Sequence, residues 1–399
     1  MKFLHTSDWH LGKLFHEKSL IEDQKHVLNQ ILERMQEAYR SNSPYAALVV
    51  SGDIYDRAMP PSEAVTLLDD FLVRITETVP GVHVFMNSGN HDSATRLSFA
   101  AEFLKKHNIH IATNTEDMLI PVIVEQGNEK IAFYQLPFLT PLSVKSHNPE
   151  EFLRTQQQLY SEACSKIAES HKKNYGNMPA VLNAHVYSMG SITGASERTN
   201  VGAVEQVDVS VFKDFAYGAF GHIHKFQVCD KNKRCYYPGA LLAYNFDDDP
   251  ESGILEVELK SAEETPVVKR LFFNVLHPVV KITAEMKQLV GSEADKKLVK
   301  ENSENYVQVI LTDKVTPSEA FANLKTVFPN LLSVSLKKSE TGEQNYSIQQ
   351  RKAAIKSNDP EKIFMQFMKD VYGNSAEDEL QQKEKEIFVE AASNMKMDV

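Results

Sequence analysis

The stretch VHVFMNSGNHD, residues 82–92, decides the fold because it joins a strand-like run directly to a set of polar side chains. Residues 82–86 are predicted to form a short buried strand, and residues 87–91 follow it without a break. Four other strand-like runs end in the same way. They are 3–5 before Thr6-Ser7-Asp8, 46–50 before Ser51-Gly52-Asp53, 181–182 before Asn183-Ala184-His185, and 215–220 before Gly221-His222-Ile223-His224.

Two segments with helical periodicity lie between the first three strand-like runs in the sequence. Apolar residues recur at helical spacing in 21–39 and again in 62–75. Short strands buried on both faces and alternating with helices predict an α/β fold with a central sheet covered by helices. In open α/β sheets the ligand lies beyond the carboxyl ends of the strands. We therefore expect the five polar clusters to meet there and to form the functional site.

The composition excludes several classes of protein. The 399 residues predict two or three domains, and the net charge of −11 argues against a generic basic clamp on nucleic acid. Three cysteines are too few for a disulfide scaffold and lack the spacing of a zinc site. No run approaches the roughly 20 apolar residues that span a bilayer, and the N-terminus lacks a signal-peptide pattern. A cytoplasmic protein without a membrane segment is expected.

The side chains in the clusters are carboxylates, imidazoles and an amide, with no thiolate. This mixture suits Mn²⁺, Fe²⁺ or Zn²⁺ better than Ca²⁺, which prefers oxygen ligands alone. Two such ions roughly 3.5–4 Å apart activate water and hold both oxygens of an in-line phosphoryl displacement. The neighbouring glycines allow the backbone to approach the site closely. Each motif alone is weak evidence, but five in order at strand ends predict a two-cation centre.

The ordered motifs D-x-H at 8–10, G-D-x-x-D at 52–56, G-N-H-D at 89–92, His185 and G-H-x-H at 221–224 resemble those of the calcineurin-like metallophosphoesterase superfamily. The longer strings 5–13, 22–24, 52–57 and 60–62 resemble the bacterial SbcD family of nuclease subunits, counterparts of the Mre-type nucleases. Ala184 and Ala240 depart from the residues usual there. The resemblance implies a four-layer α/β sandwich with a small α+β capping domain and C-terminal helices.

The same resemblance implies roles for individual residues. One cation is held by Asp8, His10 and His224, the other by Asn90, His185 and His222, and Asp53 bridges both. His91 is not a ligand; it contacts the scissile phosphate and acts as general acid. Asp56 either orients His91 through its carboxylate or stabilises a turn.

Two further residues near these motifs have alternative interpretations. Arg57 binds a phosphate or, as we prefer, pairs with a neighbouring acid. Trp9 is expected to pack behind the ligand loop rather than to stack on a base.

Three segments are predicted: a nuclease domain at 1–275, a capping module at 276–345 and a helical tail at 346–399. The module combines strands at 279–282, 306–311 and 332–336 with a helix at 318–327. By resemblance it positions DNA; the alternative is a stabilising appendage. The two amphipathic helices expected in the tail dock on an SbcC-type, SMC-related ATPase or fold back on the body.

The leading hypothesis is a nuclease subunit that uses two divalent ions, with Mn²⁺ preferred, to hydrolyse DNA in end processing, repair and recombination. By resemblance it has double-strand exonuclease and single-strand or hairpin endonuclease activity, and it forms a homodimer within a heterotetramer. The first alternative is a small-molecule or cyclic-nucleotide metallophosphoesterase. The second is a catalytically silent scaffold for DNA ends, which the presence of His91 opposes.

Overall fold

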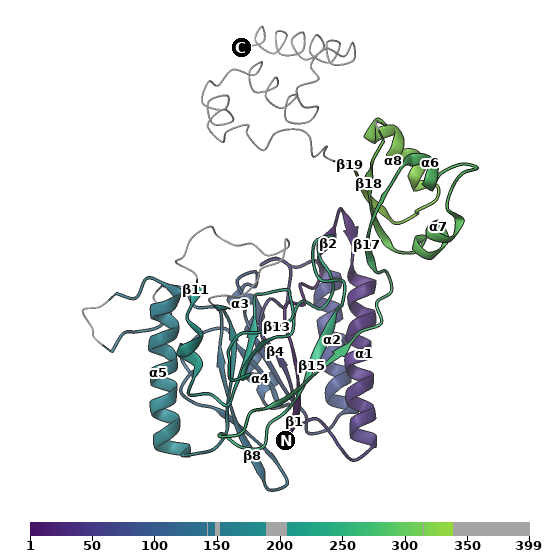
Figure 1. The fold of residues 1–399 in the computed structure, drawn as a ribbon. Helices are drawn as coiled ribbons and strands as arrows, with labels where there is room; N and C mark the ends of the chain where they lie inside the picture. The colour runs from purple at the N-terminus through teal and green to yellow at the C-terminus, as the bar shows by residue number, and fades with distance from the viewer. Residues whose placement is uncertain (142, 148–151, 189–205, 314, 338–399) are drawn as a thin grey trace, which may run out of the picture. The chain divides into compact units, whose positions relative to one another are not determined.

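The computed structural model describes residues 1–141, 143–147, 152–188, 206–313 and 315–337 (Figure 1). Two six-stranded sheets form its larger part. The first has the order β16 (Val267–Phe272), β15 (Gly253–Glu258), β1 (Lys2–Thr6), β4 (Ala47–Val50), β5 (His83–Asn87) and β6 (Ile109–Ala112). The second has the order β13 (Gln227–Val228), β14 (Cys235–Tyr237), β12 (Tyr217–Gly221), β9 (Ala180–His185), β8 (Glu129–Leu136) and β7 (Val122–Gln126).

Each sheet has a parallel centre. The strands β1, β4, β5 and β6 run parallel in the first sheet, and β8, β9, β12 and β14 run parallel in the second. Antiparallel strands lie outside each centre: β15 and β16 in the first sheet, β7 and β13 in the second. The carboxyl ends of the central strands therefore share one edge in each sheet.

Helices cover the outer faces of the two sheets, so the body has four layers. One apolar core lies between the first sheet and helices α1 (Ile21–Arg40) and α2 (Ser62–Thr78). Another lies between the second sheet and α5 (Gln156–Tyr175). A third core joins the sheets face to face, where the rings of Phe85 and Phe133 stack with centroids 4.6 Å apart. This arrangement confirms the expected four-layer α/β sandwich.

The expectation of a single central sheet is wrong. Both sheets are buried on both faces, because each packs against helices on one side and against the other sheet on the other. Strands in either sheet therefore show the same continuous apolar sequence. Periodicity alone does not distinguish two buried sheets from one.

Most of the predicted elements lie where the pattern placed them. The helix expected at 21–39 is α1, whose buried face includes Val27, Leu28, Ile31, Leu32 and Met35. The helix expected at 62–75 extends to Thr78 as α2. The short elements are β2 (Leu14–Phe15), β3 (Lys18–Ser19), α3 (Ala94–Leu97), α4 (Ala101–Lys105), β10 (Tyr187–Ser188), β11 (Gln206–Val207) and the 3₁₀ helix η1 (Val209–Phe212).

A three-stranded sheet follows the body, in the order β17 (Val279–Ala284), β18 (Tyr306–Leu311) and β19 (Leu331–Leu336). It has its own apolar core with α6 (Met286–Leu289), α7 (Lys296–Asn302) and α8 (Pro317–Lys325). These elements confirm the strands and the helix expected there, while the boundaries at 276 and 345 remain predictions. The tail at 346–399 lies outside the described residues.

Asp23 of α1 connects the body to this small sheet. Its carboxylate accepts a hydrogen bond from the Tyr306 hydroxyl at 2.8 Å, and the other oxygen lies 2.8 Å from His277 Nδ1. Among the described residues, no helix has both the length and the apolar composition that crossing a membrane requires.

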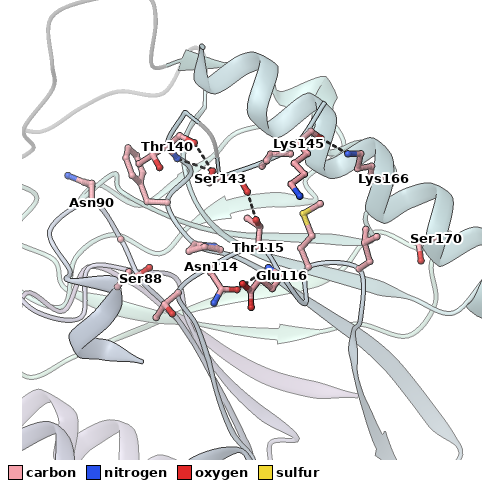
Figure 2. A pocket seen from close by; sticks show the side chains of 18 of the residues that line it. Ser88, Asn90, Asn114, Thr115, Glu116, Thr140, Ser143, Lys145, Lys166 and Ser170 are labelled. Atoms are coloured by element: carbon pink, nitrogen blue, oxygen red, sulfur yellow. Dashed lines mark hydrogen bonds between the residues drawn. The ribbon is translucent and has the colours of Figure 1, made fainter. Parts of the chain in front are cut away.

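A cavity of about 1220 Å³ opens beside the carboxyl ends of the central strands (Figure 2). Its walls come from the segments that follow β5, β6 and β8, and from one face of α5. The candidate site begins at its rim, at Asn90.

Candidate metal centre

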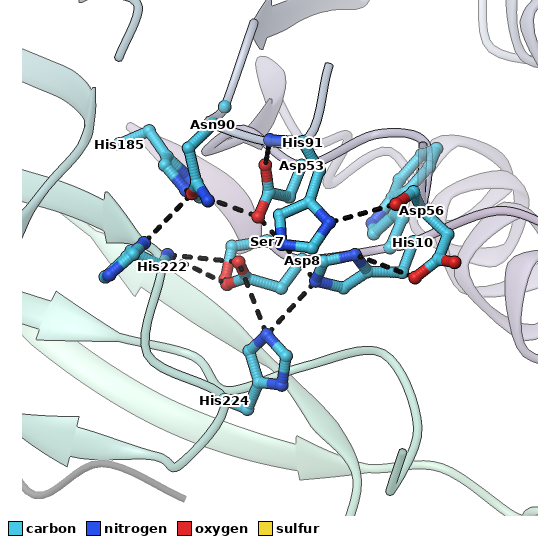
Figure 3. Close-up of polar contacts among 12 residues, drawn as sticks. Ser7, Asp8, His10, Asp53, Asp56, Asn90, His91, His185, His222 and His224 are labelled. Atoms are coloured by element: carbon cyan, nitrogen blue, oxygen red, sulfur yellow. Dashed lines mark hydrogen bonds and ion pairs between the residues drawn. The ribbon is translucent and has the colours of Figure 1, made fainter. Parts of the chain in front are cut away.

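The nine predicted metal ligands and catalytic residues lie together at the carboxyl ends of five strands (Figure 3). The two sheets contribute jointly, β1, β4 and β5 from the first and β9 and β12 from the second. Most of the side chains are buried, whereas Asn90 is exposed and His91 and Asp56 are half-buried. The nine are Asp8, His10, Asp53, Asp56, Asn90, His91, His185, His222 and His224.

One cluster of donor atoms is formed by Asp8, His10 and His224. Their ligand atoms all lie within 4.8 Å of one another. The Nε2 atoms of His10 and His224 are 3.1 Å apart, and His224 Nε2 is 4.0 Å from Asp8 Oδ1. This spacing allows one cation to contact all three side chains.

A second cluster is formed by Asn90, His185 and His222. The Oδ1 atom of Asn90 lies 2.9 Å from His185 Nε2 and 3.1 Å from His222 Nδ1. Asp53 stands between the clusters, because its Oδ2 is 3.4 Å from His185 Nε2 and 3.7 Å from His10 Nε2. One carboxylate therefore faces both groups of donors.

The hydrogen bonding of His185 shows that a cation fits the second cluster. Its Nδ1 lies 2.8 Å from the Ser51 carbonyl oxygen, to which it donates. Burial disfavours the charged ring, but the Asp53 and Asp8 carboxylates outweigh it and raise the pKa of His185 to about 9, so without a cation Nε2 carries a proton and faces Asn90 Oδ1 and Asp53 Oδ2. A divalent cation in place of this proton would meet three atoms that offer electron pairs, His185 Nε2, Asn90 Oδ1 and Asp53 Oδ2. These oxygen and nitrogen donors suit a transition metal.

Burial affects the imidazole and carboxylate side chains of the site in opposite ways. It lowers the pKa values of His222 and His224 to about 3, so both rings are neutral and able to donate a lone pair. Burial also raises the pKa of Asp8 to about 7, because a carboxylate without a nearby cation is costly to bury. A bound cation relieves this cost directly.

The backbone around the cluster is strained. Asp8, His10, Asp53 and His222 all have positive φ angles, of 51°, 43°, 49° and 102°. Such conformations cost about 1–3 kcal/mol each and persist where the surrounding structure enforces them, often at functional sites. Position 89 requires glycine for a steric reason, because a Cβ atom there would lie 2.0 Å from Asp53 Oδ1.

His91 lies beside Asp53 and is oriented by the backbone. Its own N–H donates to Asp53 Oδ1 at 2.9 Å, and its ring Nδ1 lies 2.9 Å from the Asp56 carbonyl oxygen. The atom of Asp56 that faces this ring nitrogen is thus the backbone carbonyl oxygen and not the carboxylate, which one of the two alternatives for Asp56 required. That carboxylate accepts from Lys13 Nζ at 2.7 Å, and Arg57 Nε lies 3.5 Å from it. The Asp56 carboxylate thus pairs with the Lys13 ammonium group, and the His91 ring faces the Asp56 backbone instead.

Trp9 is fully buried, with its indole N–H bonded to Thr6 and its ring edge against Phe71. This confirms the expected packing role. Arg57 lies near an acid, as we preferred, and its side chain is 61% exposed.

Two polar residues support the site and were not singled out by the sequence. The Asp92 carboxylate accepts backbone N–H groups from Ile54, Tyr55 and Gly89, at 2.9–3.0 Å, and so ties the loop after β4 to the loop after β5. Gln24 of α1 donates to the carbonyls of Trp9 and His10. The sequence signals were the G-N-H-D motif for Asp92 and, for Gln24, its place in the string 22–24 that resembles the SbcD family.

Comparisons with known proteins bear on this site. Residues 1–226 match the family model described as calcineurin-like phosphoesterase. The chain is 30% identical over 378 residues to the protein of Staphylococcus saprophyticus that is named as the SbcD component of the SbcCD nuclease, covering 94% of each chain. It is 29% identical over 378 residues to the protein of the same name from Staphylococcus epidermidis, covering 93% of each.

A solved structure of the sulfate thiohydrolase SoxB from Thermus thermophilus also aligns, with a TM-score of 0.37 and 12% identity over 68% of this chain and 56% of that chain. This likeness is too weak to carry an argument. The family match extends over more than half of the chain and includes every residue of the candidate metal centre. The chain therefore belongs to the calcineurin-like phosphoesterase family.

Proposed function

We propose that the chain is the nuclease subunit of an SbcCD-type complex and hydrolyses phosphodiester bonds of DNA with two divalent cations, preferably Mn²⁺. The observation that carries the proposal is the position of Asp53, whose Oδ2 faces both donor clusters while its Oδ1 accepts from His91. Similarity over 94% of a curated SbcD chain supports the choice of substrate.

The chain supplies seven ligands in this proposal. Asp8, His10 and His224 hold one cation, Asn90, His185 and His222 hold the other, and Asp53 contacts both. When bound, such a pair of ions supplies an activated water and neutralises charge on the phosphate. The acidic net charge of the chain is then no obstacle, because the local field of the ions decides where a phosphate binds.

His91 is the proposed general acid. Because its Nδ1 donates to the Asp56 carbonyl, Nε2 is the ring atom left to exchange a proton. A protonated imidazole can give that proton to the leaving oxygen of the cleaved phosphodiester. The ring is half-buried, so a substrate can reach it.

Asp56 is proposed to position His10 rather than His91. When His10 binds a cation through Nε2, its Nδ1 carries the proton, and this atom is buried without a hydrogen-bond partner among the described residues. The Asp56 carboxylate lies 3.7 Å away and is the acceptor that faces it. Carboxylates often orient metal-binding histidines in this way. Lys13, at 2.7 Å, disfavours a further cation on the same carboxylate.

The proposal includes partners and location. The module at 276–345 positions DNA, and the tail at 346–399 binds an SbcC-type, SMC-related ATPase in the cytoplasm. Two chains form a homodimer within a heterotetramer. Phe99 and Phe103, 84% and 61% exposed beside α3 and within α4, offer an apolar surface for the second copy.

Light scattering tests the homodimer. The double variant F99S/F103S should be monomeric at concentrations where the wild type is dimeric. Val267→Ser/Phe272→Ser, on the exposed sheet edge β16, is the matched control and should remain dimeric. A dimeric F99S/F103S variant would rule out this surface.

A cleavage assay tests the function. The full chain is incubated with end-labelled linear and hairpin DNA, with and without Mn²⁺, the ATPase partner and ATP. Cleavage that requires Mn²⁺ is expected on both substrates. Activity on mononucleotides or cyclic nucleotides alone would favour the small-molecule phosphoesterase instead.

A further inference from the structure

The cavity beside Asn90 extends away from the metal centre toward α5 (Figure 2). Its volume of about 1220 Å³ exceeds the roughly 300–1,000 Å³ typical of pockets for single small molecules. None of the seven proposed ligands except Asn90 lines it. The cavity is thus continuous with the catalytic centre but is not needed to hold cations.

An aromatic side chain stands where the cavity meets the metal centre. The ring of Phe138 lies edge-on to the ring of His185, with centroids 6.2 Å apart, and it is only partly buried. The backbone N–H of Phe138 donates to the Ser88 carbonyl at 2.8 Å, which fixes the segment that carries it. A partly exposed aromatic face beside a cation centre is a suitable platform for a nucleobase.

Three lysines line the cavity farther from the metal centre, and two of them can offer positive charge to a ligand. The third, Lys166, is already neutralised, because its Nζ lies 3.2 Å from Glu162 Oε1 and also donates to the Lys145 carbonyl. Lys145 and Lys173 are exposed, and neither forms an ion pair within the described parts of the chain. Their ammonium groups are therefore available to an anionic ligand.

Hydrogen bonds of hydroxyl and amide side chains hold the cavity wall between Phe138 and the two exposed lysines. The side chain of Thr115 donates to the Ser143 carbonyl, and the Ser143 hydroxyl bonds the Thr140 carbonyl at 2.7 Å. Asn114 accepts from the Glu116 backbone at 2.9 Å through its carbonyl oxygen, so its amide N–H groups remain as donors. A polar wall held in place by its own hydrogen bonds suits a ligand with sugar and base edges.

We propose that this cavity binds a single-stranded segment of a few nucleotides adjoining the scissile phosphate. A base stacks on Phe138, and backbone phosphates bind Lys145 and Lys173. The inference rests on the proposed nuclease function and names the path of the strand beyond the metal centre. A free mononucleotide shares the same chemistry, so the test separates the two sources.

Calorimetric titration of the full chain with tetrathymidylate tests this path, with EDTA present to prevent cleavage. The double variant K145A/K173A should bind about tenfold more weakly than wild type. The slope of log K against log salt should become about 1.4 shallower, because two contacts to single-strand phosphates are lost. Equal affinity and slope in wild type and K145A/K173A would overturn the proposal.

A matched control is K130A/K260A. Lys130 lies at the start of β8 and Lys260 just beyond β15, at the opposite ends of the strands from the cavity, and both are more than half exposed. This variant should bind like wild type. A loss equal to that of K145A/K173A would mean that only net charge matters, which contradicts a built path.

Phe138→Leu tests the stacking step, because it removes the aromatic ring and keeps an apolar side chain in the wall. Affinity for tetrathymidylate should fall about fivefold or more, with an unchanged salt slope. Thymidine monophosphate and inorganic phosphate are titrated in parallel and should bind at least tenfold more weakly than the tetranucleotide. Equal affinity for the mononucleotide would replace a strand path by a free-nucleotide site and overturn the proposal.

Cleavage of end-labelled DNA by the wild type with Mn²⁺ separates this inference from the proposed function. If the wild type cleaves DNA but K145A/K173A binds tetrathymidylate as tightly as the wild type does, only the proposed strand path is overturned. Binding that depends on both lysines, without any DNA cleavage, leaves the cavity site standing and overturns the proposed nuclease function.

Discussion

His91 Nδ1 lies 2.9 Å from the backbone carbonyl oxygen of Asp56, not from the Asp56 carboxylate. The orientation of the imidazole is therefore set by the loop after β4, and the Asp56 side chain remains free for another contact. Because the Asp56 backbone and not its side chain orients His91, we expect variants of His91 and of Asp56 to have different effects.

Replacing His91 by Ser removes the proposed general acid but keeps the backbone bond from residue 91 to Asp53. We expect kcat to fall about 10²–10⁴-fold on DNA, the usual contribution of a positioned acid. Metal content, measured by mass spectrometry of the purified protein, should stay at two ions per chain. Unchanged cleavage would refute the role of His91.

Replacing Asp56 by Ala removes the acceptor that faces His10 Nδ1, but not the carbonyl that orients His91. We expect the affinity for Mn²⁺ to fall about 10–100-fold, with kcat at saturating Mn²⁺ near the wild-type value. Calorimetric Mn²⁺ titration and a rate assay give the two quantities, with the surface variant D70A as control. A low kcat with normal Mn²⁺ affinity would return Asp56 to the orientation of His91.

Replacing Asp92 by Ala leaves three backbone N–H groups without their acceptor. Because unsatisfied donors cost about 1–3 kcal/mol each, we expect the free energy of unfolding in EDTA to fall by about 3 kcal/mol. Urea denaturation measures the change. Asp230 also accepts three backbone N–H groups, but one comes from the exposed Asn232, where water can replace it. D230A should therefore cost less, and equal losses would count against a special role for Asp92.

We expect folding stability to depend on pH through His110, a buried residue outside the candidate metal centre. Burial, followed by the charges of His83 and Lys105, lowers the pKa of His110 to about 4 from the usual 6.5. Above pH 6.5 both states are neutral there; below it the unfolded chain gains a proton that the folded chain does not. Folding stability is therefore lost as pH falls from about 6.5 to 4, by up to about 3 kcal/mol from this group.

The variant His110→Phe removes this titration and keeps a ring stacked on Phe85. Its free energy of unfolding, from urea denaturation in EDTA, should fall less than that of the wild type between pH 7 and pH 4. Parallel curves over this range would contradict the assignment.

The residues of the candidate centre could be predicted because the proposed metal ligands follow strands as local motifs. Asp8, Asp53 and Asn90 each come just after a buried strand, and parallel strands bring such positions to a common edge. His185 is the last residue of β9, so a longer strand than expected still places it there.

The remaining features depend on contacts that sequence does not encode locally. Asp92 acts through backbone N–H groups up to 38 positions away, which no side-chain pattern records. The Asp56 carboxylate faces Lys13, 43 residues earlier, and this long-range pair decides which contact its side chain makes. The second sheet has the same apolar signature as the first, so only tertiary packing shows that there are two.

In the proposed centre, Asp53 joins two cation sites of different composition. Anomalous diffraction at the manganese edge, from crystals of the full chain grown with Mn²⁺, tests it most directly. We expect two peaks about 3.5–4 Å apart, on either side of the Asp53 carboxylate. One should lie among Asp8, His10 and His224, and the other among Asn90, His185 and His222. A single peak, or two peaks that do not share Asp53, would contradict the proposed bridging role of Asp53.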